Sequence, residues 1–91
     1  MKTTIAQRIK FQNEFKAKRK DNPIILFRDN DFYLAYNEDA ETLGQIFESS
    51  LKITKVEDYT FISFSFTKLD IYLPAIIRRG HKVAICDGEI K

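Results

Sequence analysis

Cysteine and histidine, which often supply nucleophiles, bases and metal ligands, occur once each in this 91-residue sequence. They are Cys86 and His81, and both lie in one apolar stretch near the carboxyl end. His81 has no cysteine or carboxylate partner at the spacing of a metal site, and the two residues form no nucleophile and base arrangement. We therefore interpret Cys86 as a buried apolar side chain and His81 as a polar residue at a strand end.

Carboxylates and glycines add little evidence for catalysis. Asp87, Glu89 and Lys91 form the acidic-x-lysine pattern of some nucleases, but this pattern is common by chance. The phosphate-binding loop of an ATPase needs closely spaced glycines, and the three glycines here lie far apart, at Gly44, Gly80 and Gly88. The sequence predicts that the chain is not an enzyme, hydrolyses no ATP, and has no cofactor or metal site.

Charge is distributed unevenly along the chain. Residues 1–20 carry seven basic side chains and one acidic one, whereas residues 21–91 carry eight basic and twelve acidic side chains. A basic segment of this kind can contact phosphate groups, and the candidates here are Lys16, Lys18, Arg19 and Lys20. The alternative is the solvated face of a terminal helix, and charge alone favours that alternative.

Periodicity and turn residues predict the elements that would position these side chains. A helix is expected over 4–20, lying across the domain edge because Arg8 and Gln12 interrupt its apolar side. A buried strand is expected over 24–27, then a reversal at 29–31 in which Asn30 tolerates a positive φ. The returning element begins at Phe32 and Tyr33, and Asn37 is expected to cap a second helix.

The rest of the chain predicts a hairpin and a final helix and strand. The hairpin covers 51–56 and 59–66, Thr67 opens a third helix that contains Pro74, and 81–86 forms the last strand. The expected fold class is α/β (α+β), a single small domain over 1–91 with a mixed β-sheet of about four to five strands and three helices. The lone cysteine and the lack of a long apolar run predict a cytoplasmic protein that is neither exported nor inserted in a membrane.

Two segments carry a resemblance to a known family. They are 22–40, NPIILFRDNDFYLAYNEDA, and 70–87, DIYLPAIIRRGHKVAICD. Together they resemble the N-terminal mismatch-recognition domain, domain I, of the MutS DNA mismatch-repair proteins. In that family an apolar strand and an arginine lead to Gly-Asp-Phe-Tyr-Glu, and a later helix and glycine lead to Lys-Val-Ala-Ile-Cys-Glu. The segment from 49 to 67 is shorter and more divergent than the family pattern.

The resemblance implies a base-reading role for the turn. In the family, the phenylalanine of Phe-x-Glu wedges into the DNA minor groove at a mismatch, and the glutamate hydrogen-bonds the mismatched base. The phenylalanine matches Phe32, but the glutamate position is Leu34, which forms no hydrogen bond. Asn30 replaces the family's glycine, and Arg28 matches the family's arginine. The DNA-binding residues that we expect are Phe32, Tyr33, Leu34, Arg28, Lys16, Lys18, Arg19 and Lys20.

Two functions remain open from the sequence. The first is a DNA-binding module for double-stranded DNA, with mismatched or distorted duplex as a candidate target, whose mismatch discrimination is weakened by Leu34. The second is a protein-protein interaction module that retains the domain I fold without base recognition, which Leu34 and the acidic body favour. The exposure of the Phe32 ring separates the two functions in part, because the ring is either an exposed wedge or a core aromatic.

Overall fold

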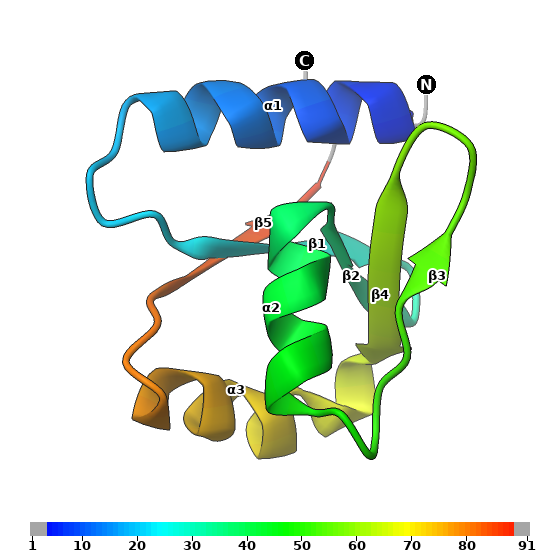
Figure 1. The fold of residues 1–91 in the computed structure, drawn as a ribbon, viewed down its shortest axis with the longest axis vertical. Coiled ribbons are helices and arrows are strands. Elements are labelled where there is room, and N and C mark those ends of the chain that lie inside the picture. Colours follow the sequence, from blue (N-terminus) through cyan, green and yellow to red (C-terminus); the bar gives the residue numbers. More distant parts are fainter. Residues whose placement is uncertain (1–3, 89–91) are drawn as a thin grey trace.

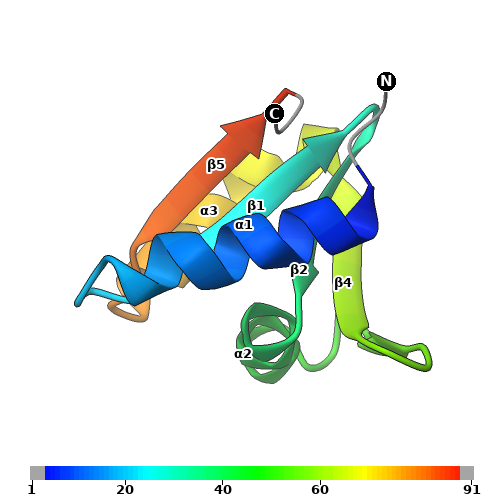
Figure 2. The same cartoon turned by 90° about the horizontal axis from the view of Figure 1, so that it is seen from above.

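The computed structural model describes residues 4–88 as one mixed sheet with helices on both faces (Figures 1 and 2). The helices are α1 (Ile5–Ala17), α2 (Glu38–Ile46) and α3 (Leu69–Arg78), and a 3₁₀ turn, η1 (Phe66–Lys68), precedes α3. The strands are β1 (Ile24–Asp29), β2 (Phe32–Tyr36), β3 (Thr54–Lys55), β4 (Thr60–Ser65) and β5 (Val83–Asp87). The predicted fold class is thus confirmed.

Strand β1 lies next to the edge of the sheet but is covered on both faces. The sheet order is β3-β4-β2-β1-β5, in which β5 runs parallel to β1 and the other neighbours are antiparallel. Alternate side chains of 24–27 enter two separate apolar clusters, which explains the continuous apolar run. Ile24 and Leu26 pack with residues of α2 and α3, whereas Ile25 and Phe27 pack with residues of α1.

Helix α1 covers one face of the sheet rather than its edge, so that expectation was wrong (Figure 2). The helix begins with a capping box in which the Thr4 hydroxyl accepts from the Gln7 N–H at 3.1 Å and Gln7 Oε1 accepts from the Thr4 N–H at 2.7 Å. Gln12, expected to break the apolar side, is buried and donates from Nε2 to the Tyr36 carbonyl at 3.1 Å. Gln12 is thus held on this face by one hydrogen bond to the last residue of β2, while its Oε1 has no hydrogen-bond partner among the described residues.

Local caps differ from the expectations in two places. Asn37 occupies the N-cap position of α2, as expected, but its side chain makes no capping hydrogen bond: it has a positive φ of 53°, and its side-chain oxygen accepts from the Thr60 N–H at 3.1 Å. Thr67 does not open α3 either, because the 3₁₀ turn intervenes and Ser65 accepts from the Thr67 N–H. Pro74 lies inside α3, as expected. None of the helices among residues 4–88 is long and apolar enough to cross a membrane.

Candidate nucleic-acid interface

The β1–β2 turn presents Phe32 at one end of the molecule. Asp29 and Phe32 are paired in the ladder, so the turn itself consists of Asn30 and Asp31. Asn30 has a φ of 54°, the left-handed conformation that asparagine accepts more readily than most residues. The Asp31 carbonyl accepts from the Phe66 N–H at 2.9 Å, which ties the turn to the end of β4. Phe32 is 51% exposed in this position, whereas a core aromatic would be buried.

The two residues after Phe32 point to opposite faces of the sheet. Tyr33 is buried in the cluster beneath α2 and α3, with its ring centroid 5.7 Å from that of Phe64. Leu34 lies on the α1 side, half-buried against the cluster that contains Phe27. Of the three consecutive residues expected at a DNA surface, only Phe32 has an exposed side chain. Leu34 is half-buried, and Tyr33 is part of the core.

Arg28 is held against the protein on the face opposite to Phe32. Its guanidinium carbon lies 4.5 Å from the centre of the Phe66 ring and 5.8 Å from that of the Tyr33 ring. Its Nε donates to the Asn30 carbonyl at 3.0 Å. These contacts give Arg28 a role in holding the shape of the turn, since the cation rests on two aromatic faces.

Arg8, which the sequence did not single out as a site residue, is the α1 cation beside the turn. Its Nη1 donates to the Tyr36 hydroxyl at 3.0 Å, and its Nη2 lies 3.3 Å from the Asp29 carboxylate. Burial raises the pKa of the Tyr36 hydroxyl, so Tyr36 stays protonated and neutral. The Arg8 charge offsets that of Asp29 next to Phe32. The signal for this role was the arginine that interrupts the apolar side of α1.

The four basic residues expected to contact phosphate differ in their surroundings. The Lys16 side chain is 8% exposed, and its Nζ pairs with the Asp39 carboxylate and lies 3.4 Å from Glu38 Oε1. Arg19 forms a bidentate pair with Asp21 at 2.8 and 2.9 Å, and this hydrogen bonding holds the pKa of the Asp21 carboxyl well below its usual range. Lys18 and Lys20 are exposed.

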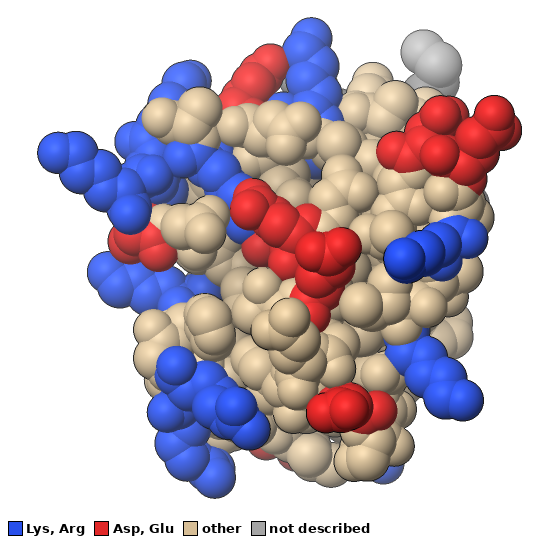
Figure 3. Space-filling model, viewed as in Figure 1, with Lys and Arg blue, Asp and Glu red and all other residues tan. Residues whose placement is uncertain are grey.

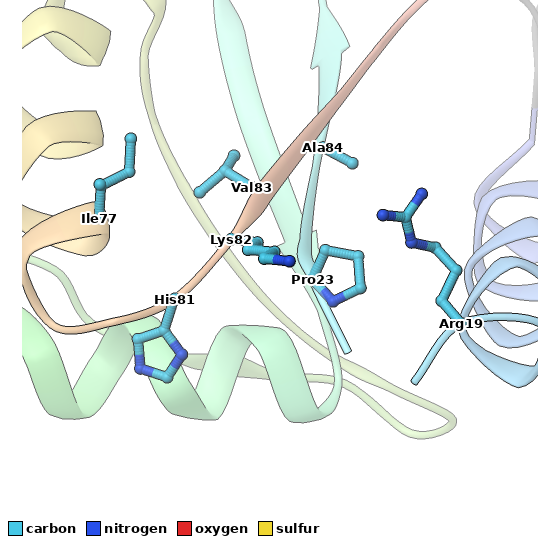
Figure 4. A pocket seen from close by; sticks show the side chains of 7 residues that line it. All are labelled: Arg19, Pro23, Ile77, His81, Lys82, Val83 and Ala84. Carbon is cyan, nitrogen blue, oxygen red and sulfur yellow. The ribbon is translucent and has the colours of Figure 1, made fainter. Parts of the chain in front are cut away.

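Lys18, Arg19 and Lys20, but not Lys16, belong to a larger surface that we call the basic end. It consists of six cations from the carboxyl ends of α1 and α3 and the loops that follow them, namely Lys18, Arg19, Lys20, Arg78, Arg79 and Lys82. Figure 3 shows many Lys and Arg side chains gathered at the left of the molecule with one acidic group among them, whereas most acidic side chains lie at the centre and toward the right. A hollow of about 430 Å³ lies here beside the start of β5, and Arg19, His81 and Lys82 contribute its polar side chains (Figure 4).

The basic end and Phe32 lie at opposite ends of β1. The strand starts at Ile24, whose N–H donates to the Lys82 carbonyl at 2.8 Å, and it finishes at Asp29 in the turn. Six residues at a rise of about 3.3 Å each span about 17 Å from the first to the last. The sequence had suggested one interface containing both Phe32 and the basic residues, but the structure presents them as two separate surfaces.

The chain is similar to known DNA mismatch repair proteins. The model of the MutS domain I family matches residues 7–91. The chain belongs to this family. The DNA mismatch repair protein MutS of Phocaeicola vulgatus is 42% identical over 79 residues, covering 81% of this chain and 9% of that protein. The corresponding MutS proteins of Thermotoga neapolitana and Methanococcoides burtonii are 38% and 35% identical over 74 residues.

Membership of the MutS domain I family confirms the resemblance seen in segments 22–40 and 70–87. The chain spans only 8 to 9% of the length of these three relatives, so it corresponds to a small part of each. Asn30 has a positive φ in this turn, a conformation that glycine and asparagine accept more readily than other residues.

The described part of this MutS domain I chain, residues 4–88, was searched for side chains that could bind a metal ion or act as a nucleophile. Among residues 4–88, no group of three His, Cys, Asp or Glu side chains is placed to hold a metal ion. Cys86 is half-buried in β5 rather than fully buried, and burial raises the pKa of its thiol, which lowers the fraction present as reactive thiolate. Glu89 and Lys91 of the acidic-x-lysine pattern lie outside the described residues.

Proposed function

We propose that this chain is a DNA-recognition module, not an enzyme, that meets double-stranded DNA with Phe32. The observation that carries the proposal is the half-exposed Phe32 ring at the tip of the β1–β2 turn in a MutS domain I fold. An aromatic ring inserted at a base step costs unstacking energy of a few kcal/mol but permits the duplex to bend. A mismatched or distorted step is the cheapest to open, and such a step is the proposed target. A cytoplasmic location accompanies this proposal.

Leu34 limits the specificity that we propose for this module. The aliphatic side chain of Leu34 offers no hydrogen bond to a base, and it packs against the buried cluster beneath α1 that contains Phe27. Stacking by Phe32 is tolerant of sequence because every base has a π face. The module should therefore bind duplexes generally and prefer a mismatch only slightly. Tyr33 and Arg28 support the turn from the other face in this proposal, without touching bases.

Replacing Phe32 by alanine tests the wedge. We expect Phe32→Ala to weaken binding to a mismatched duplex by about 1–3 kcal/mol, which corresponds to roughly 5- to 150-fold, because a stacked ring is removed. The free energy of unfolding should fall by less than about 1 kcal/mol, since the ring is half-exposed. Fluorescence anisotropy with a labelled duplex measures the first quantity and urea unfolding the second.

Phe27→Ala is the matched control for the Phe32 test. Phe27 lies in the neighbouring strand and is fully buried, so its truncation should cost about 3–5 kcal/mol of stability. A Phe32→Ala variant as unstable as Phe27→Ala would show that the ring is structural. Unchanged affinity of a stable Phe32→Ala variant would show that DNA is not bound there.

We further propose that the basic end binds phosphate groups, mainly through Lys18 and Lys20. Lys16 and Arg19 are engaged with carboxylates, so they have less to offer to phosphate. Reversing both charges, Lys18→Glu with Lys20→Glu, should reduce the slope of log affinity against log salt by about 0.9 for each phosphate that is no longer neutralised. Titrations of one duplex at several salt concentrations measure this slope.

The control for the salt experiment uses two exposed lysines elsewhere on the surface. Lys52→Glu with Lys55→Glu changes the net charge equally, but these residues lie in and before β3, at the other edge of the sheet. An equal reduction of the slope in both double variants would mean that net charge, not the basic end, governs binding. An unchanged slope in Lys18→Glu with Lys20→Glu would remove these lysines from the interface.

The alternative proposal is a protein-interaction module that keeps the MutS domain I fold. It is favoured by apolar side chains that stand exposed outside the turn, at Ile71, Ile77 and Ile85. Salt separates the two proposals, because phosphate contacts weaken steeply with salt and apolar contacts do not. Affinity for duplex DNA that is undetectable at low salt would favour the protein-interaction proposal.

A further inference from the structure

Helix α1 is attached to the sheet largely through polar side chains. Arg8, Gln12 and Lys16 follow one another at intervals of four residues, so they form one row along the helix. Their partners lie in β1, β2 and α2, and in the same order they are Asp29 with the Tyr36 hydroxyl, the Tyr36 carbonyl, and Asp39. The position of α1 on the sheet therefore depends on charged and polar contacts along the length of the helix.

The apolar part of the α1 interface is small. Gln12 is the one fully buried residue of α1, and its Oε1 has no hydrogen-bond partner among residues 4–88. The apolar residues that α1 packs against the sheet are only half-buried, and they are Ile9, Phe11 and Phe15. A buried oxygen without a partner destabilises the docked helix, and elements with few buried apolar contacts open before the rest of a protein unfolds. We therefore expect α1 to leave the sheet as a unit while the separate core beneath α2 and α3 stays folded.

The first residue of the polar row, Arg8, lies beside the turn that carries Phe32. Asp29 and Phe32 are opposite each other in the ladder between β1 and β2, so both side chains point to the α1 face with their Cβ atoms about 5 Å apart. The Asp29 side chain is 45% exposed, so a duplex that reaches the Phe32 ring also meets this carboxylate, which repels phosphate groups. The Arg8 guanidinium lies 3.3 Å from the carboxylate and is only 11% exposed, which suits it to neutralising Asp29 rather than to binding phosphate.

We propose that Arg8 is a positioning residue for the Phe32 turn and makes DNA binding depend on the docking of α1. This inference rests on the proposed DNA-binding function. In the docked state the buried Tyr36 hydroxyl holds the Arg8 guanidinium, and Arg8 neutralises Asp29. When α1 leaves the sheet, the Asp29 charge stays uncompensated beside Phe32, and the turn binds a duplex more weakly. Because such coupling is reciprocal, a bound duplex favours the docked helix by the same factor.

A double-mutant cycle between Arg8 and Asp29 tests the positioning role through duplex affinity. Arg8→Met should weaken binding by about 10-fold or more, because the Asp29 charge then stands against the phosphates. Asp29→Asn should bind at least as tightly as the parent chain, and Arg8→Met with Asp29→Asn should recover most of the loss. Lys10→Met is the matched control, because it removes the same charge from an exposed position of α1 and should change affinity far less. A double variant as weak as Arg8→Met would show that Arg8 bonds to DNA itself and would overturn the proposal.

Amide hydrogen exchange of the free chain tests whether α1 opens on its own. The amides of 13–17, in the second half of α1, should be protected at least about 10-fold less than those of the ladder between β2 and β4. Arg8→Lys keeps a positive charge beside Asp29 but lacks the planar fork that also reaches Tyr36. It should therefore retain most of the DNA affinity while the α1 amides exchange faster. Equal protection of both sets of amides in the parent chain would show that α1 does not open separately and would overturn the proposal.

The same exchange measurement with duplex DNA present tests the coupling. A duplex at about ten times its dissociation constant should slow exchange in both sets of amides by about 10-fold, if it binds only the chain with α1 docked. In Asp29→Asn the slowing should persist between β2 and β4 but largely disappear from α1, because the undocked state then also accepts DNA.

The outcomes with duplex separate this inference from the proposed function. Slowing in the parent chain that is confined to the amides between β2 and β4 would show that DNA binds without a docked α1, which overturns this inference alone. Slowing of neither set would overturn the proposed function as well. Urea unfolding shows whether Arg8→Met is folded, and if it is not, the exchange of Asp29→Asn tests the coupling with Arg8 intact.

Discussion

Lys16→Met should lower the free energy of unfolding by about 3–5 kcal/mol at pH 7, because it leaves a buried carboxylate without its counterion. That carboxylate belongs to Asp39, which is buried and pairs with the Lys16 ammonium group. The second oxygen of the Asp39 carboxylate accepts from the Ile25 N–H at 3.0 Å. Ile25 lies in β1, before the residues that pair with β2. One carboxylate thus joins α1, α2 and β1.

The destabilisation should shrink as the pH falls. Burial raises the pKa of the Asp39 carboxyl above its ordinary value, even though the Ile25 N–H and Lys16 favour the charged form. A carboxyl with a raised pKa in the folded state binds its proton more tightly there than in the unfolded chain. The contribution of Asp39 to the free energy of unfolding therefore falls as the pH rises from the ordinary carboxyl pKa of about 4 through the raised pKa. Without Lys16 the pKa of the Asp39 carboxyl in the folded chain rises further. The stability lost in Lys16→Met is therefore largest at neutral pH and smallest near pH 4.

Urea unfolding at pH 7 and at pH 5 measures this deficit, with Lys18→Met as the matched control. Lys18 is exposed two residues further along, so its substitution should change stability by no more than about 0.5 kcal/mol. A Lys16→Met variant that loses stability equally at both pH values would show that the packing of the lysine stem, not the Asp39 charge, is responsible. A variant as stable as the parent chain would contradict the buried pair itself.

The elements that rest on apolar periodicity could be predicted from the sequence. The continuous run 24–27 predicted a strand covered on both faces, and each residue enters one of two clusters in alternation. Asn30 predicted a turn with positive φ, and its φ is 54°. These predictions succeed because burial of an apolar pattern and the steric tolerance of asparagine are local properties of the chain.

The features that depend on distant polar partners could not be predicted. Sequence position marks Asp39 only as an acidic residue in the first turn of α2, but its partner Lys16 is 23 residues away in sequence. Asn37 was expected to cap α2, but it bonds to Thr60 on another strand instead. Arg8 and Gln12 interrupt the apolar face of a helix, although each has a partner on β1 or β2. Spacing alone does not reveal which carboxylate or carbonyl will face such a residue.

The candidate site was predicted in its parts but not in its arrangement. The sequence placed Phe32 at a turn, where the structure has it, and the four basic residues in the first helix, of which the structure leaves only Lys16 there because α1 ends at Ala17. Their separation follows from the direction of α1, whose start lies beside Asp29 and whose end lies beside Asp21 and Lys82. The path of a helix across a sheet is set by side-chain packing between them, which no local pattern in the sequence encodes.

Leu34→Glu should convert this chain into a better discriminator of mismatched DNA. In the proposed interface, Phe32 supplies stacking, and the glutamate of the family pattern would supply a hydrogen bond to the mismatched base. A hydrogen bond to a charged group contributes about 1.5–3 kcal/mol, so the ratio of mismatched to matched affinity should rise by roughly 10- to 150-fold at most. Leu34→Gln should give a smaller rise, because a neutral hydrogen bond contributes about 0.5–1.5 kcal/mol.

The position of Leu34 also sets the cost of this change. Leu34 shares the α1 side of β2 with Phe32, so a longer side chain there can extend along the same face toward the turn. Because Leu34 is only half-buried, a carboxylate at this position keeps access to water and does not need to enter the core uncharged. Leu34→Met, which keeps the packing without a hydrogen bond, is the control and should leave the affinity ratio unchanged.

The decisive measurement is a double-mutant cycle between the two positions. The affinity ratio is compared for the parent chain, Leu34→Glu, Phe32→Ala and the two changes together, with the duplex tethered covalently to raise its effective concentration. If Phe32 opens the base step that the glutamate then reads, Leu34→Glu should lose most of its gain in the Phe32→Ala background. A gain that survives without Phe32 would mean that the carboxylate acts elsewhere. No gain in a folded Leu34→Glu chain, while Phe32→Ala weakens binding, would show that this turn stacks on DNA without the geometry for reading a base.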